Sequence, residues 1–239
     1  QDGFGRRALR RLIVAALALA GPAAAVERGY TVTSFDRVSV QGPFAVIVTS
    51  GKPPSARASG DPVALERVQV RVEGRTLLVR PAASGWVGYP GREPAPAVVR
   101  VSTQAIASAA LTGSGSLEVD RLTGARVSVT NEGSGRITIG RLEADVASLG
   151  AVGSGGIAVA GRAKQASLLA RGAASVDAAG LSVADLALTS ETAGAMTVDA
   201  IRSAKVSASG AGAVTITGTA ACQVTRRGLG PLACGGSTR

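Results

Sequence analysis

The sequence predicts an all-β protein: a parallel β-helix-like solenoid of about 18–20 residues per coil, capped by an N-terminal β-layer. A Gly-Ser-Gly turn recurs at even spacing, in LTGSGSLEVD (111–120), NEGSGRITIG (131–140) and AVGSGGIAVA (151–160). Apolar and polar residues alternate after each turn, which is typical of a half-buried strand. Aromatic residues make up only 3% of the chain, which favours a narrow core of small aliphatic side chains.

Residues 1–25 have the layout of a secretory signal peptide. A basic stretch, GRRALRR (5–11), precedes the apolar run LIVAALALA (12–20), and Ala23-Ala24-Ala25 provides an A-x-A cleavage site. The apolar run is shorter than the roughly 20 residues that span a bilayer. We therefore expect cleavage before Val26, export to the periplasm or cell surface, and no transmembrane segment in the mature chain.

We expect residues 26–103 to form the capping β-layer. Alternating stretches predict strands at FDRVSVQG (35–42), FAVIVTSG (44–51), VQVRVEG (68–74), TLLVRP (76–81) and VVRVSTQ (98–104). A short helix is predicted in GDPVALER (60–67), with Asp61 as its N-cap and Pro62 in its first turn. We expect this layer to cover the open end of the solenoid and hide its sheet edge.

We expect residues 104–236 to form the coils of the solenoid and residues 237–239 to form a short tail. We call the first residue of each turn the corner residue; in order these are Gly113, Gly133, Gly153, Gly172, Thr192, Gly210 and Gly228. Apolar residues stand four and six positions after most corners, as Ile137 and Ile139 do, and four before, as Val129 does. These side chains should point inward. The competing interpretation is an antiparallel sheet with a hairpin at every turn.

Composition limits the classes of function. The chain contains no histidine, which removes the commonest general base and metal ligand. The net charge is +10, carried mostly by evenly spread arginines, which is typical of a solvated surface but also suits weak attraction to anionic glycans or other envelope components. Nucleic-acid binding is disfavoured because no aromatic residue follows Pro90 to stack on bases.

Few residues are candidates for a site. Cys222 and Cys234 lie six residues before and after Gly228, at positions that are apolar in most coils; a structural disulfide is favoured over a redox pair or two free thiols. Trp86 and Tyr89, in the loop that begins at Ser84, are the best candidates for ligand contact, although packing over the solenoid end as part of the cap is the favoured interpretation.

The carboxylates give no clear catalytic pair. Asp120 and Asp199 occupy equivalent positions four coils apart, about 19 Å, which is too far for a glycosidase pair. Glu143 and Asp145 are close in sequence and could face the same way. We predict no catalytic, cofactor-binding or metal-binding residue.

The layout resembles the putative auto-transporter adhesin head GIN domain family. The resemblance rests on FDRVSVQGPFAVIVTSG, then LERVQVRVEGRTLLVRP, then the GSG series and a segment with two cysteines, and covers residues 35–235. It implies a secreted, β-helical bacterial protein and transfers no catalytic or binding residue. A non-enzymatic structural or adhesive module of the cell envelope is therefore favoured; the alternative is a carbohydrate-active β-helix enzyme or a polysaccharide-binding protein.

Overall fold

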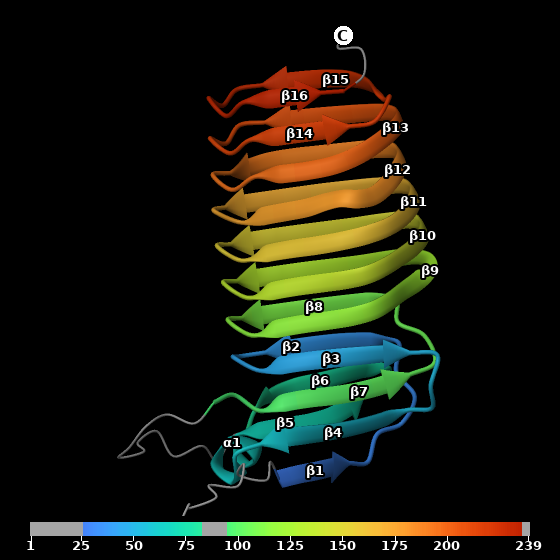
Figure 1. Cartoon of the computed structure of the whole chain (residues 1–239), viewed down its shortest axis with the longest axis vertical. Helices are drawn as coiled ribbons and strands as arrows, with labels where there is room; N and C mark the ends of the chain where they lie inside the picture. The colour runs from blue at the N-terminus through green and yellow to red at the C-terminus, as the bar shows by residue number, and fades with distance from the viewer. Residues whose placement is uncertain (1–25, 83–94, 236–239) are drawn as a thin grey trace, which may run out of the picture.

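The computed structural model describes residues 26–82 and 95–235, and shows an elongated all-β solenoid of about six turns (Figure 1). The predicted fold class is confirmed. The elements in chain order are β1 (Val26–Tyr30), β2 (Arg37–Gln41), β3 (Ala45–Ser50), β4 (Ser55–Gly60), α1 (Pro62–Glu66), β5 (Val68–Glu73), β6 (Thr76–Pro81), β7 (Val98–Thr103), β8 (Ser108–Gly113), β9 (Ser116–Gly133), β10 (Arg136–Gly153), β11 (Gly156–Gly172), β12 (Ser175–Thr192), β13 (Met196–Ala208), β14 (Val214–Thr217), β15 (Ala221–Arg226) and β16 (Leu232–Cys234).

The coils form two faces, because each long strand bends near its middle and pairs on both sides of the rod. The β3 face has the order β1-β4-β7-β3-β9-β10-β11-β12-β13-β14-β16. The β2 face has the order β5-β6-β2-β8-β9-β10-β11-β12-β13-β15. The two faces meet at the Gly-Ser-Gly corners on one side and at the strand bends on the other (Figure 1).

The corners stack in the predicted register. Gly113 pairs with Gly133, Gly133 with Gly153, Gly153 with Gly172, and Gly172 with Thr192. Because every pairing from β8 to β16 is parallel, the antiparallel hairpin interpretation does not hold.

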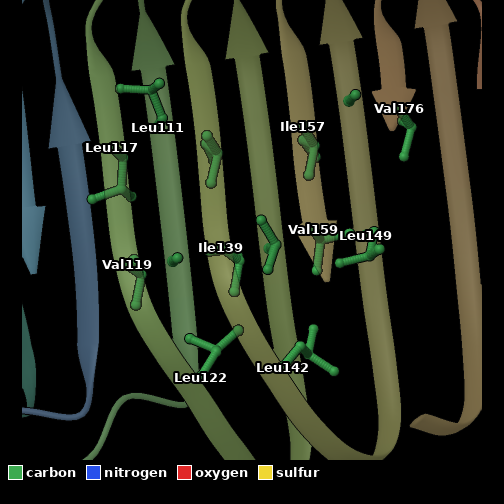
Figure 2. Packing of buried hydrophobic residues seen from close by; sticks show 14 of the residues in the cluster. Leu111, Leu117, Val119, Leu122, Ile139, Leu142, Leu149, Ile157, Val159 and Val176 are labelled. Atoms are coloured by element: carbon green, nitrogen blue, oxygen red, sulfur yellow. The ribbon is translucent and has the colours of Figure 1, made fainter. Parts of the chain in front are cut away.

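The core is a stack of aliphatic side chains between the two faces (Figure 2). Leu117, Ile137 and Ile157 occupy equivalent positions on successive coils and are no more than 2% exposed. The polar residues between them, such as Thr138, lie on the outer surface. The predicted inward positions are thus confirmed in the coils from β9 to β14.

Truncating one core side chain should test this register. We expect Ile137→Ala to lower the free energy of unfolding by about 2–4 kcal/mol, because it leaves a cavity between two neighbouring coils. Thr138→Ala, one residue further on the outer surface, should change it by less than about 0.5 kcal/mol. Chemical denaturation of both variants measures the difference, and equal effects would contradict the assigned faces.

The N-terminal segment contributes coils of its own. β2 pairs in parallel with both β6 and β8, and β3 with both β7 and β9, so the coil made by β2 and β3 lies between two coils that come later in the chain. Only the strands at the very end, β1, β4 and β5, pair antiparallel. The helix begins as predicted, and the Asp61 carboxylate accepts a hydrogen bond from the Val63 amide at 2.9 Å.

This arrangement refines the expected cap. Four strands of residues 26–103, β2, β3, β6 and β7, continue the two faces by parallel pairing, and the antiparallel strands β1, β4 and β5, together with α1, lie at the N-terminal end of the rod (Figure 1). We propose that these elements protect the end of the rod, because an uncovered sheet edge is prone to pair with other chains.

A disulfide bond joins Cys222 and Cys234, with 6.6 Å between their Cα atoms. Cys222 lies on β15, which pairs with β13, and Cys234 lies on β16, which pairs with β14. The bond therefore connects the two faces of the last coil.

Removing this bond should loosen the C-terminal coil first. We expect a Cys222→Ala/Cys234→Ala variant to lose about 3 kcal/mol of its free energy of unfolding, the value for a closed loop of this size. The last coil should open first, because it has only one neighbouring coil. Limited proteolysis followed by mass spectrometry should find the earliest cuts within residues 221–239. First cuts within residues 113–210 instead would show that the bond does not protect the end.

Candidate functional site

The side of the rod formed by the strand bends carries the candidate site. We call this side the bend surface; it comprises residues 121–126, 141–146, 161–165, 182–185 and 199–203. The pairing register between neighbouring strands is constant at the corners but shifts at or next to the bends. The shifts lie between Ile139 and Leu142, between Ala158 and Ala160, and across residues 178–185. Such irregularities are common beside functional sites, because they redirect side chains.

The bend surface contains a hollow of about 1120 Å³ that extends over several coils. Backbone and small side chains form its floor, including Gly124, Ala144 and Ala163. Charged side chains line it as well: Arg141, Glu143, Asp145, Arg162 and Lys164. Small residues at the bends thus leave room, while longer side chains provide the charge.

Both carboxylates in the hollow are paired with cations. The Arg141 guanidinium donates two hydrogen bonds to the Glu143 carboxylate, at 2.8 and 2.6 Å. The Lys164 ammonium lies 2.7 Å from the Asp145 carboxylate. These pairs are partly exposed and contribute little to stability, so their main effect is to fix the side chains.

Three arginines remain unneutralised on this surface. Arg121, Arg126 and Arg162 are exposed, and none forms an ion pair with any residue that the structure describes. The bend surface therefore carries an excess of positive charge.

Two carboxylates on this surface, those of Glu143 and Asp185, have a lowered pKa and so favour their ionised form. The hydrogen bond and charge of Arg141 lower the pKa of Glu143, and the charges of Arg162 and Arg121 lower it further. At the edge of the bend surface, hydrogen bonds from Arg202 and Ser203 lower the pKa of Asp185 to about 2. Carboxylates held ionised in this way suit binding better than proton donation.

The remaining candidate carboxylates have structural contacts. Asp120 accepts hydrogen bonds from the Ser50 amide and hydroxyl, at 2.9 and 2.8 Å, and so connects β3 with the first long coil. Asp199 accepts one from the Ser182 hydroxyl at 2.9 Å. Within residues 26–82 and 95–235, no group of acidic or cysteine side chains could hold a metal ion.

Trp86 and Tyr89 lie outside the described residues, and their contact with a ligand stays a prediction. A second, more apolar cavity of about 470 Å³ lies at the N-terminal end. It is lined by residues that include Phe44, Ala64 and Pro96.

Sequence reasoning missed the arginines of the bend surface. They looked evenly spread, yet Arg121 and Arg141 each follow their corner glycine by eight residues, and Arg162 follows Gly153 by nine. The equal offset of Arg121 and Arg141 was the available signal for that pair, whereas the register shift between β10 and β11 places Arg162 opposite Glu143.

Fold and surface together define the class of protein: a parallel β-solenoid that presents an open, charged surface on one side. The chain belongs to the family described as putative auto-transporter adhesin, head GIN domain, whose sequence profile matches residues 34–220. No curated protein matches it. Within the described part of the chain, no helix is long and apolar enough to cross a membrane.

Several solved structures share the fold. A putative adhesin from Bacteroides fragilis is 20% identical with a TM-score of 0.75, covering 87% of this chain and 96% of its own. A protein from Parabacteroides distasonis described as a putative lipid binding protein is 19% identical with a TM-score of 0.65, at 87% and 96% coverage. A putative adhesin from Parabacteroides merdae is 17% identical with a TM-score of 0.64, at 87% and 95% coverage. At these identities the likeness establishes the fold alone.

Proposed function

We propose that the protein is a non-enzymatic, adhesion-type binding module of the cell envelope, and that it holds its partner on the bend surface. The observation that carries this proposal is the hollow in which both lining carboxylates are paired with cations, while Arg162 forms no ion pair with any described residue. Such a site offers charge and hydrogen bonds to a ligand, and Arg141 holds the pKa of the Glu143 carboxyl below its usual range, which disfavours proton donation by that group. Membership of an adhesin family supports the same function.

The solenoid suits this role because it is a stiff support. The long strands β9 to β12 are hydrogen-bonded to neighbours along nearly their whole length, so the bends that carry the charged side chains are held at both ends. A site on such strands keeps its geometry before the ligand arrives, which reduces the entropic cost of binding.

We also propose that the protein is exported. The leader-like residues 1–25 and the Cys222–Cys234 bond support this, because disulfides persist mainly in oxidising compartments. Mass spectrometry of the protein from its native envelope fraction should find Val26 at the N-terminus. Recovery with residues 6–20 still attached would contradict the proposal.

A panel of polysaccharides and envelope fractions tests the binding function. We expect saturable binding without release of shortened products. Lys164→Glu, which reverses a charge in the hollow, should weaken binding, whereas Lys205→Glu on the outer side of the β2 face should not. Product release that is lost in Glu143→Gln would instead establish the carbohydrate-active enzyme.

A further inference from the structure

We infer that the ligand of the bend surface is an acidic polysaccharide that lies along the rod axis, across successive coils, with its anionic groups on Arg121 and Arg162. This inference rests on the proposed function and adds to it the chemical class and direction of the ligand. It is carried by the placement of the arginines, the unbalanced charge and the open shape of the hollow.

The arginines are arranged along the rod. Arg121 on β9 pairs in register with Arg141 on β10, and Arg162 on β11 lies opposite Glu143 of β10. Neighbouring strands in a sheet are about 4.8 Å apart, so guanidinium groups recur on three successive coils. A ligand that runs along the axis meets Arg121 on β9 and then Arg162 on β11, two coils further on, whereas a ligand that runs across the rod meets the guanidinium groups of one coil only.

The charge on these coils is not balanced within the described chain. Like charges at directly opposite positions, as at Arg121 and Arg141, destabilise a sheet. Glu143 is hydrogen-bonded to Arg141 and also lies opposite Arg162, so one carboxylate serves two guanidinium groups, and Arg121 forms no ion pair with any described residue. Anionic groups from outside would relieve this repulsion, and the planar guanidinium suits bidentate pairing with carboxylate or sulfate.

The shape of the hollow favours a polymer over a small molecule. Sites for small molecules are mostly enclosed and apolar. This hollow is lined by charged and small residues from several coils. It extends along the rod from Thr123 on β9 to Ser182 on β12 and Ile201 on β13. The small residues permit close approach of a chain, and the hydroxyl groups can bind sugar hydroxyls.

Nucleic acid is the other common polyanion, and the surface does not suit it. The bend surface contains no aromatic side chain, so bases would find nothing to stack on. A glycan presents its charges without needing such a platform.

Binding of defined polymers to the full chain tests the inference. The probes are polygalacturonate, as a polyuronate, dextran, as a neutral polysaccharide, and single-stranded DNA. The test variant is Arg121→Ser/Arg162→Ser. The control is Arg136→Ser/Arg227→Ser, which removes the same charge from exposed arginines elsewhere that also have no ion pair in the described chain.

We expect polygalacturonate to bind and salt to weaken it, because exposed charge interactions are screened. The test variant should raise the dissociation constant at least about tenfold, and the control less than about threefold. Equal effects of the two variants would overturn the inference, since net charge alone would then explain binding. DNA binding as tight as polygalacturonate binding would overturn the glycan assignment. Dextran binding that is weakened by Lys164→Glu would support the proposed function while overturning the anionic ligand.

Discussion

A chain that begins at residue 104 is expected to lose its cooperative unfolding transition and to aggregate, although it retains every Gly-Ser-Gly coil. β8 and β9 rest on β2 and β3, and these strands would be missing. The deletion uncovers the backbone edge of both faces together with the apolar residues Leu111, Leu117 and Val119, which are at most 1% exposed in the full chain. Long, flat and apolar edges of this kind drive association between chains.

The deletion also removes a specific polar contact between the two regions. The amide and hydroxyl of Ser50 would no longer bind the Asp120 carboxylate at the start of the first bend. Circular dichroism, thermal melting and light scattering would show the loss of the transition and the onset of aggregation.

A shorter deletion gives the matched control. A chain that begins at residue 31 loses only β1, whose residues are mostly exposed and which pairs with β4 alone. This chain should keep a cooperative transition near that of the chain beginning at Val26. If the chain beginning at residue 104 melted as cooperatively as this control, the N-terminal coils would be dispensable and the proposed capping role would fall.

The sequence determines the coils well because each coil repeats one environment. The corner glycine and the apolar residue four positions later recur from coil to coil, so Gly133 and Ile137 could be assigned from spacing alone. The same logic placed Cys222 and Cys234 at matched inward positions, and the disulfide is present.

The order of the N-terminal strands could not be predicted in this way. Alternation tells which side chains of β2 point inward, but not that β2 pairs with both β6 and β8, which are far away in sequence. The bend surface was hidden for a related reason. Differences in coil length are absorbed at the bends, so residues there do not keep a constant spacing. The roles of Trp86 and Tyr89 remain predictions.

The second large effect is expected at a corner. Gly133→Ala should lower the free energy of unfolding by about 3 kcal/mol or more, because it combines backbone strain with overpacking. Gly133 has a φ of 120°, and a Cβ atom there would lie 2.6 Å from the Gly113 carbonyl oxygen. That oxygen also accepts hydrogen bonds from the Ser134 and Gly135 amides, at 3.0 and 2.9 Å. Moving it away from the new methyl group would therefore weaken two hydrogen bonds between coils.

Gly150→Ala is the control on the same strand. A Cβ atom at Gly150 meets nothing within 4 Å, and its backbone does not need the left-handed region. This substitution should leave stability unchanged or raise it by about 0.5 kcal/mol, since alanine restricts the unfolded chain. Chemical denaturation of the two variants under one set of conditions gives the comparison. A difference below about 0.5 kcal/mol would mean that the corner at Gly133 can accept a side chain, as the corner at Thr192 does, and that glycine is not required at Gly133.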